Sequence, residues 1–217
     1  MPWPTKAVME QIYALNLWGT NNARFYSGCG SHDDNIVVPY VDAISSFLTS
    51  LDDPITVCDL GCGDFNVGKQ LVRYTKHYIA VDIVSDLIVY NSEVYDSENL
   101  TFLCLNIAED ELPSADCVMV RQVLQHLSNQ EIQQIINKLT PFKYVIITEH
   151  VPKGTFMPNK DIISGQGIRL KKQSGVNLLR APFHCNPLEY RELLSIDLPN
   201  SQGKIITTCY TFLNGKP

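Results

Sequence analysis

The amino-acid sequence predicts an α/β fold in which a mostly parallel β-sheet carries helices on both faces. Apolar, β-branched runs alternate along the chain with segments of helical periodicity, which is the pattern of such a sheet. The first of these runs ends in Asp59-Leu60-Gly61-Cys62-Gly63, a glycine turn directly after a strand. A strand followed by a glycine turn and a helix binds nucleotide-like cofactors at the carboxyl end of a parallel sheet.

Length and composition predict one globular domain over residues 1–217. The net charge of −6, from 17 basic and 23 acidic residues, argues against a broad nucleic-acid surface. No apolar run approaches the ~18 residues of a membrane span, and the N-terminus lacks the apolar core of a secretory signal. Seven cysteines, most of them in strand-like runs, favour free thiols over disulfides or a zinc site. We therefore expect a cytoplasmic protein with a small-molecule partner.

Residues 1–35 are expected to be the least regular part of the chain, with one short helix near residues 8–15. The loop over residues 17–31 is rich in Gly, Asn and Ser but also carries Trp18 and Arg24. One interpretation is a segment that folds over the cofactor, with Ser27, Gly28, Gly30 and Ser31 as donors. The other is a segment that only packs its aromatic residues on the domain.

The remaining elements follow from periodicity, breakers and capping residues. Asp52-Asp53-Pro54 ends the first long helix, and Ser128-x-x-Glu131 is a capping box. A final strand that arrives after a turn is able to enter antiparallel. The expected helices span residues 36–51, 67–74, 85–91, 129–139 and 187–194, and the expected strands span 55–60, 77–83, 100–106, 115–122, 144–150 and 204–213.

Residues 152–187 lack strong periodicity and contain several Gly and Pro residues. A stretch of this length without clear elements is usually functional or disordered, and its position after a strand favours a substrate lid. Its basic run, Arg169-Leu170-Lys171-Lys172, is interpreted as a solvated face because so short a run rarely forms a binding patch.

The second strand ends in an acid, Asp82, nineteen residues after Gly63. A carboxylate at the tip of this strand is placed to accept hydrogen bonds from a ribose diol. The NAD fingerprint requires Gly or Ala three residues after the second glycine, and this chain has Asn66 there. The motif therefore favours a nucleotide-like cofactor other than NAD.

Several motifs in register resemble one family. The run from Val57 to Phe65 is similar to the first motif of class I S-adenosylmethionine-dependent methyltransferases, hydrophobic-x-Asp-x-Gly-x-Gly. Asp82, Asn106-Ile107-Ala108 and the segment from Arg121 to Leu127 match later motifs, so that the resemblance covers roughly residues 36–150. It implies a Rossmann-like, seven-stranded sheet whose last strand is antiparallel, and S-adenosyl-L-methionine as the cofactor.

The resemblance also implies roles for individual residues. Asp59 would order the glycine loop and help to hold the cofactor's amino group, and Asp82 would accept both ribose hydroxyls. Ile83 and Ile107 would enclose the adenine, while Asn106 either binds its edge or only forms a turn at the strand end. The complete set of expected cofactor-binding residues is Arg24, Ser27, Asp59, Gly61, Cys62, Gly63, Asp64, Phe65, Asp82, Ile83, Asn106, Ile107, Arg121 and Gln122.

Catalysis would consist mainly of aligning an acceptor with the activated methyl group and excluding water. An alcohol or phenol acceptor also needs its proton removed. The candidate catalytic residues are His126, Glu149 and His150, and His126 is also open to interpretation as a structural histidine in a loop. His184, Asp161 and Asn159 are weaker candidates in the proposed lid. Too few carboxylates follow the fourth and fifth strands for a metal-dependent mechanism.

The sequence thus predicts a methyltransferase that modifies a small polar acceptor at oxygen or nitrogen. Two alternatives stay open. One is a non-catalytic binder of S-adenosylmethionine, such as a sensor or partner subunit. The other is an enzyme that methylates a protein side chain.

Overall fold

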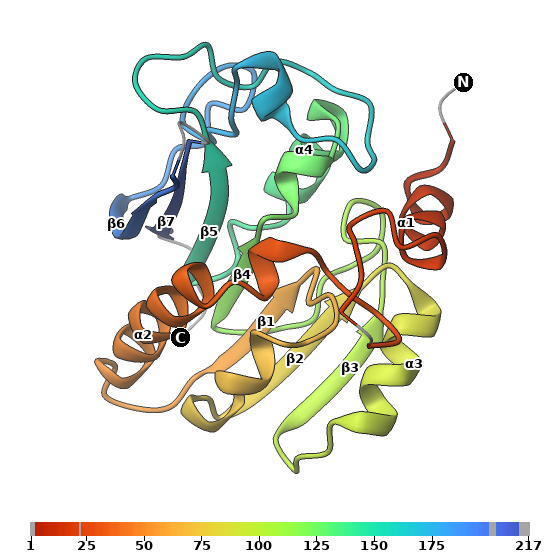
Figure 1. The fold of residues 1–217 in the computed structure, drawn as a ribbon. Helices are drawn as coiled ribbons and strands as arrows, with labels where there is room; N and C mark the ends of the chain where they lie inside the picture. The colour runs from red at the N-terminus through yellow and green to blue at the C-terminus, as the bar shows by residue number, and fades with distance from the viewer. Residues whose placement is uncertain (1–2, 22, 200–202, 213–217) are drawn as a thin grey trace.

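The computed structural model describes residues 3–21, 23–199 and 203–212 of the chain. Its centre is one seven-stranded sheet with the strand order β3-β2-β1-β4-β5-β7-β6, which Figure 1 shows from β3 at one end to β6 at the other. The first five strands pair in parallel, β7 pairs antiparallel with β5, and β6 pairs antiparallel with β7. The strands are β1 (Thr56–Leu60), β2 (His77–Asp82), β3 (Leu100–Cys104), β4 (Cys117–Arg121), β5 (Tyr144–Val151), β6 (Glu189–Asp197) and β7 (Lys204–Thr211).

Helices cover both faces of this sheet, as the sequence predicts. One buried cluster packs side chains of α1, α3 and α4 against the sheet, and a second packs those of α2 against the opposite face. None of the helices in the described part of the chain is long and apolar enough to cross a membrane. The α-helices are α1 (Thr5–Ala14), α2 (Asp34–Thr49), α3 (Ser85–Val94) and α4 (Asn129–Ile136), and the short 3₁₀ helices are η1 (Cys29–Ser31), η2 (Gly68–Gln70), η3 (Val72–Tyr74), η4 (Leu124–His126) and η5 (Arg169–Lys172).

The alternation of side chains along the strands divides the core into these two layers. In β1, Val57 belongs to the layer under α2, whereas Cys58 and Leu60 belong to the layer under α3 and α4. Strands that are buried on both faces read as continuous apolar runs, which is why the sequence locates β1, β2, β4 and β5 well. The carboxyl ends of these parallel strands therefore meet along one edge of the sheet.

The helix expected over residues 67–74 is wrong. The chain there forms two short 3₁₀ helices, η2 and η3, in place of one α-helix. Phe65 has a left-handed backbone with φ of 61° and folds back on Gly68, where an added Cβ would lie 2.4 Å from its ring. This close approach tightens the turn after the glycine loop, and apolar spacing alone does not report it.

The short helix expected over residues 187–194 is also wrong, because this stretch lies in β6 at the edge of the sheet. The strand is largely exposed and has a register shift between Glu192 and Leu194. An edge strand that is exposed to solvent on both faces has no alternation of apolar and polar residues. Its pairing with β7 therefore decides its conformation. Strand β6 is thus the one that the six expected strands lack, and it completes the seven that the family resemblance implies; the antiparallel last strand is β7.

Helix ends agree with the predictions in part. Ser128 and Glu131 form the expected capping box at α4, with the Ser128 hydroxyl 2.7 Å from Glu131 Oε2. The N-cap of α3 is Val84, whose N–H donates to Asp82 Oδ1 over 3.0 Å. In α2, Val37, Tyr40 and Ile44 form the buried face and Val38 is exposed.

Removing the capping hydroxyl of α4 should destabilise the protein. Ser128→Ala leaves helix N–H groups unpaired, and we expect a loss of about 1 kcal/mol in the free energy of unfolding, measured by urea denaturation. Ser46→Ala, at an exposed position inside α2, is the matched control and should change stability by less than about 0.5 kcal/mol. Equal effects of the two substitutions would contradict the capping role.

Candidate active site

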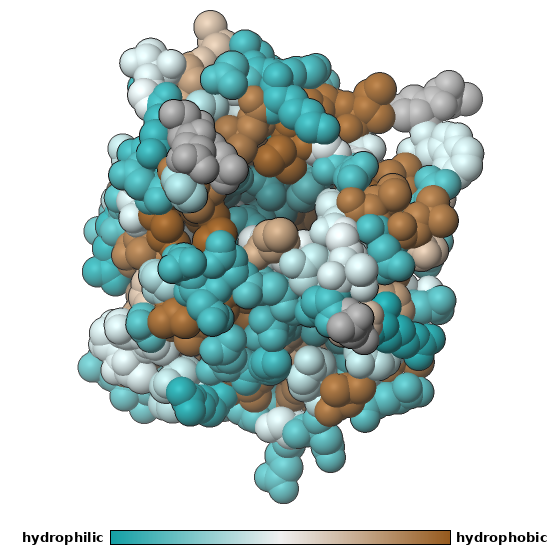
Figure 2. Space-filling view, viewed as in Figure 1, coloured by the Kyte–Doolittle hydropathy of each residue, from teal (hydrophilic) through white to brown (hydrophobic). Residues whose placement is uncertain are grey.

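A cavity of about 560 Å³ lies along the edge where the carboxyl ends of the parallel strands meet. Figure 2 shows the hollow in the middle of this face, with hydrophobic side chains gathered over α1 and over the segment that follows β5. The volume is within the range of small-ligand sites. Its walls come from the glycine loop, the ends of β2 and β4, the loop after β3, the N-terminal segment and the residues around η5.

The glycine loop is covered so closely that side chains would not fit. Gly61 and Gly63 have positive φ values of 85° and 57°. A Cβ on Gly61 would lie 2.3 Å from Val123 Cγ2, and one on Gly63 would lie 2.4 Å from Ser27 Oγ. Both glycines are therefore required by backbone conformation and by the neighbours packed on the loop.

The N-terminal segment is fastened to the glycine loop through one pair of residues. The Ser27 N–H donates to Asp64 Oδ2 and the Asp64 N–H donates to Ser27 Oγ, each over 2.8 Å. His32 Nε2 lies 2.6 Å from the same Asp64 oxygen, and the Tyr13 hydroxyl lies 2.8 Å from Ser27 Oγ. Residues 27–31 thus form part of the cavity wall, as the cofactor-covering interpretation requires.

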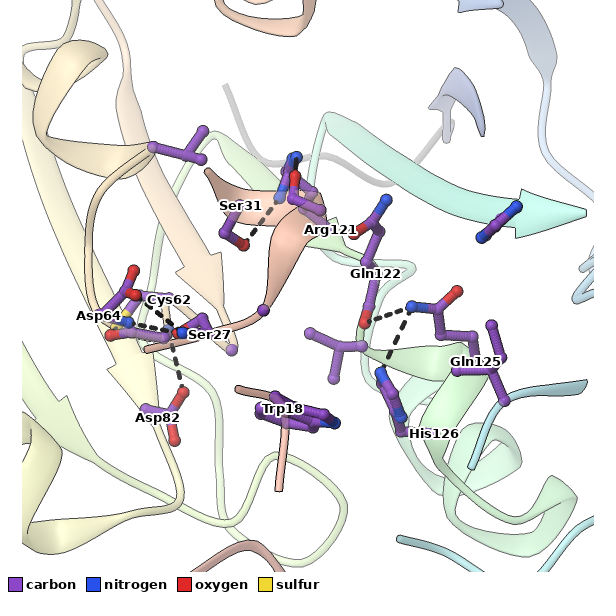
Figure 3. A pocket seen from close by; sticks show the side chains of 18 of the residues that line it. Trp18, Ser27, Ser31, Cys62, Asp64, Asp82, Arg121, Gln122, Gln125 and His126 are labelled. Carbon is purple, nitrogen blue, oxygen red and sulfur yellow. Dashed lines mark hydrogen bonds between the residues drawn. The ribbon is translucent and has the colours of Figure 1, made fainter. Parts of the chain in front are cut away.

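Arg121 links this segment to the end of β4. Its guanidinium donates to Ser31 Oγ over 3.2 Å and to the Gly30 carbonyl, and it lies over the Tyr40 ring at 4.9 Å. Figure 3 shows Arg121 pointing toward Ser31, with Gln122 beside it. Both Arg121 and Gln122 line the cavity.

Two buried carboxylates line the cavity and form no salt bridge among the described residues, although Arg121 lies near enough to Asp59 to stabilise its charge. Asp82 accepts the N–H groups of Gly63 (3.1 Å) and Val84 (3.0 Å), and burial raises its pKa. Asp59 accepts the Tyr78 hydroxyl over 2.9 Å, and burial raises its pKa to about 6. The ion pairs within residues 3–21, 23–199 and 203–212 are His32–Asp64 and Lys153–Asp197. The cavity floor therefore favours a ligand that brings positive charge and hydrogen-bond donors.

The opposite wall of this part of the cavity is mostly apolar. Ile83 and Ile107 line it, as does Asn106. Asn106 Oδ1 accepts the Ala108 N–H over 3.1 Å, so the residue forms the strand-end turn that was the alternative interpretation. An apolar slot beside a carboxylate is suited to a flat ring that carries a sugar.

Two residues of the predicted set lie outside the cavity. Phe65 is fully buried and packs against Tyr78, Tyr95 and Phe102, with ring centroids 4.8–5.7 Å away. It turns into the core because the glycine loop reverses the chain at this point. The Arg24 guanidinium lies over the rings of Phe25 and Tyr90, and Arg24 is not among the residues that line the cavity. The structure therefore gives neither side chain a place from which to touch a ligand.

Both ring nitrogens of His126 are engaged, and Figure 3 shows the contact with Gln125. Gln125 Nε2 lies 3.2 Å from the Gln122 carbonyl and 3.3 Å from His126 Nε2, while His126 Nδ1 lies 3.1 Å from the Gly165 carbonyl. Carbonyl oxygens only accept, so the amide nitrogen must face Gln122 and the ring proton must sit on Nδ1. His126 Nε2 then accepts from Gln125, and burial lowers the pKa of His126 to about 4. In this arrangement the imidazole has no free lone pair for a substrate proton.

The other catalytic candidates divide between the cavity and the core. His150, at the end of β5, lines the cavity. Glu149 is buried outside it and accepts the Leu124 N–H over 3.1 Å, and burial raises the pKa of Glu149 to about 8. His184 is exposed, whereas Asn159 and Asp161 hold neighbouring backbone groups.

The segment over residues 152–187 is tied down by Arg169. The guanidinium donates to the carbonyls of Leu124 (2.8 Å) and Leu127 (2.7 Å) and to Asn129 Oδ1 (2.8 Å). Arg169 is only 1% exposed, so its interpretation as part of a solvated face is wrong, although Lys171 and Lys172 are exposed. A buried cation can pair only with residues that the fold brings to it, and local sequence does not show these.

Several lining residues carry no motif in the sequence. They follow β4, β5 and β6, lie in β7 or stand in the N-terminal segment, and single residues at such positions have no spacing to recognise. Trp18 is an exception, since its place in a polar loop is a signal, and its ring lies 5.2 Å from that of His126. The residues that sequence reasoning missed include Gln125, Gln166, Ile168, Lys171, Leu198 and Ile205.

Comparisons with known proteins identify similar sequences among methyltransferases. Residues 57–141 match a family model described as a methyltransferase domain. Phosphoethanolamine N-methyltransferase 1 of Triticum aestivum is 29% identical over 104 residues, which are 43% of this chain and 21% of that protein. The protein of the same name from Zea mays is 26% identical over 89 residues, covering 39% and 18%. The chain thus spans about a fifth of the length of the curated relatives it matches.

Solved structures resemble the whole fold. N-methyltransferase NodS from Bradyrhizobium japonicum WM9, in complex with S-adenosyl-L-homocysteine, has a TM-score of 0.62 at 10% identity, covering 94% of this chain and 98% of that one. Magnesium protoporphyrin IX methyltransferase (ChlM) from Synechocystis PCC 6803 with bound SAH has a TM-score of 0.59 at 15% identity, covering 96% and 100%. The [4+2]-cyclase SpnF has a TM-score of 0.60 at 15% identity, covering 98% of both chains. At these identities the likeness establishes the fold.

The engaged state of His126 makes a measurable prediction. We expect nitrogen NMR of the imidazole to show a neutral ring protonated at Nδ1 from neutral pH down to near its pKa of about 4. Because the folded-state pKa lies below the ordinary value of about 6.5, acid favours the unfolded state, and His126 costs stability as the pH falls between these values. A His126 pKa near 6.5 would contradict the hydrogen-bond pattern.

Glu149 should make stability depend on pH in the opposite direction. Its folded-state pKa of about 8 lies above the ordinary value of 4.5, so its contribution is present at pH 4.5 and is lost as the pH rises through 8. Glu149→Gln should remove this loss, whose slope is at most about 1.4 kcal/mol per pH unit in urea denaturation. Glu93→Gln, on the exposed side of α3, is the control and should leave the wild-type pH profile unchanged.

Proposed function

We propose that the protein is an enzyme of the class I S-adenosylmethionine-dependent family that methylates a small molecule, because residues 57–141 match a methyltransferase-domain model. The cofactor is S-adenosyl-L-methionine, and the methyl group goes to an oxygen or nitrogen of the acceptor. The observation that carries the proposal is the buried Asp82 carboxylate beside a glycine loop that has no room for side chains.

The residues of the cavity fit this cofactor. Asp82 would accept the two ribose hydroxyls, since the N–H groups of Gly63 and Val84 bond different oxygens of its carboxylate, and a carboxylate has about four lone-pair sites. Asp59 and Asp64 place negative charge near the glycine loop, which suits the ammonium and sulfonium groups. Ile83 and Ile107 supply the apolar slot for the adenine.

When bound, S-adenosylmethionine would supply an electrophilic methyl group for the acceptor's lone pair. The chain's own task is to align the acceptor and exclude water. His126 acts as a structural histidine that fixes Gln125. His150, a second histidine of the predicted catalytic set, also lines the cavity, and we assign it as the candidate base.

The first experiment tests the cofactor. Isothermal titration calorimetry should give micromolar binding of S-adenosylmethionine and S-adenosylhomocysteine and much weaker binding of NAD. If neither S-adenosylmethionine nor S-adenosylhomocysteine binds, the proposal is wrong. Turnover of the cofactor with a panel of small hydroxyl and amino compounds, phosphoethanolamine among them, separates an enzyme from the alternative, a sensor that binds S-adenosylmethionine without using it.

Asp82 is the position at which cofactor binding is most sensitive. Asp82→Ala removes the proposed hydrogen bonds from a charged acceptor, each worth about 1.5–3 kcal/mol, so the Kd for S-adenosylhomocysteine should rise at least about tenfold. Asp86→Ala, an exposed acid in the first turn of α3, removes the same formal charge and should leave the Kd unchanged. Circular dichroism confirms that both variants fold. Unchanged affinity in Asp82→Ala would refute the assignment.

A further inference from the structure

The cavity extends well beyond the residues proposed to hold the cofactor. Those residues follow β1, β2 and β3, at one end of the sheet edge, whereas other lining residues follow β4 and β5 or belong to β7 and the turn before it. We call the lining residues within 122–127, 150, 166–171, 198–199 and 205 the acceptor end. Figure 3 shows Asp64 and Asp82 on one side of the cavity, and Gln125 and His126 on the other.

The acceptor end is apolar over much of its surface. Ile168 precedes η5, Leu198 and Pro199 follow β6, and Ile205 lies in β7, so three separate segments of the chain supply apolar side chains to one wall. Apolar side chains that face a cavity gain free energy when a ligand displaces water from them. An acceptor that fits this wall therefore has an apolar body.

The polar groups at the acceptor end are amides and imidazoles. Gln122 and Gln125 are uncharged, and His126 is held neutral by the Gln125 amide and the Gly165 carbonyl. None of the described residues of the acceptor end is a carboxylate, in contrast to Asp59 and Asp82 at the cofactor end. The carboxylate of Glu131 also lines the cavity, but it accepts hydrogen bonds from the hydroxyls of Thr5, Ser128 and Ser164. A cationic ammonium ligand would therefore find no free carboxylate here.

Positive charge is equally sparse. Lys171 is the cation of the acceptor end, and it is exposed. The neighbouring Arg121 lies at the end of β4, where its guanidinium is held by Ser31, the Gly30 carbonyl and the Tyr40 ring. Phosphate groups are bound by several charge-assisted hydrogen bonds from preorganised donors. One exposed lysine does not provide such a site.

We propose that the methyl acceptor is an uncharged small molecule with an apolar body and one hydroxyl or amino group. The proposal rests on the methyltransferase function above and narrows it to a substrate class. It separates this chain from the phosphorylated amine in the name of its curated relatives. The apolar body packs against the wall around Ile168 and Ile205, and the amides of the acceptor end meet the polar group.

The test uses the full chain saturated with S-adenosylhomocysteine, titrated with two pairs of probes. Para-cresol and indole represent uncharged, apolar-bodied compounds, and phosphoethanolamine and ethanolamine represent charged ones. We expect calorimetry to give a Kd at least about tenfold lower for the first pair, because burying one apolar side-chain surface is worth more than ~1.4 kcal/mol.

Two isoleucines of one segment form a matched pair of variants. Ile168 lines the cavity, whereas Ile163 is 76% exposed and does not. Ile168→Asn should weaken para-cresol binding about tenfold without changing the affinity for S-adenosylhomocysteine, and Ile168→Ala should act in the same direction with a smaller effect. Ile163→Asn should bind both compounds like the wild type.

Every outcome bears on the inference. Tighter binding of phosphoethanolamine than of para-cresol overturns it, and so does the failure of para-cresol and indole to bind at millimolar concentration while S-adenosylhomocysteine binds. Wild-type binding by the Ile168 variants also overturns it. Failure of S-adenosylhomocysteine itself to bind counts against the proposed function, so the two failures are distinguishable.

Discussion

The close packing around Gly61 and Gly63 is the constraint on which the rest of the site depends. The loop lies between Val123, which follows β4, and Ser27, which belongs to the N-terminal segment. An added Cβ would collide with Val123 at Gly61 and with Ser27 at Gly63. Backbone conformation, strand order and the position of the N-terminal segment are thereby tied to one another. The Ser27–Asp64 pair and the Gly63–Asp82 hydrogen bond fix the same loop from two sides.

Charge divides the cavity into two chemically different ends. At the cofactor end, Asp59 and Asp82 are buried and form no salt bridge among the described residues, and desolvation raises the pKa of both. At the acceptor end the amides and His126 are neutral, and Lys171, the cation among the described residues there, is exposed. A chain of hydrogen bonds from Gln122 through Gln125 to His126 fixes where the proton of His126 lies. A positively charged ligand is favoured at one end and an uncharged one at the other.

The sequence was sufficient where function is carried by local motifs. The glycine loop, Asp82 and the capping box of α4 are short patterns whose meaning depends on neighbours in the chain, and the structure has them where they were expected. The sequence failed where tertiary contacts decide. Strand β6 is set by its pairing with β7, and Arg169 is buried because Leu124 and Leu127, more than forty positions away, accept its hydrogen bonds. The state of His126 depends on Gly165 in the same way.

The two ends of the cavity also differ in where the chain supplies them. The match to the methyltransferase domain covers residues 57–141 and ends before β5 begins, so it contains the glycine loop and Asp82 but not His150, Ile168 or Ile205. Substitutions in the later segments can therefore change the shape of the acceptor end while the cofactor loop keeps its geometry. In proteins with this arrangement, the acceptor can change during evolution while the residues that bind the methyl donor stay the same.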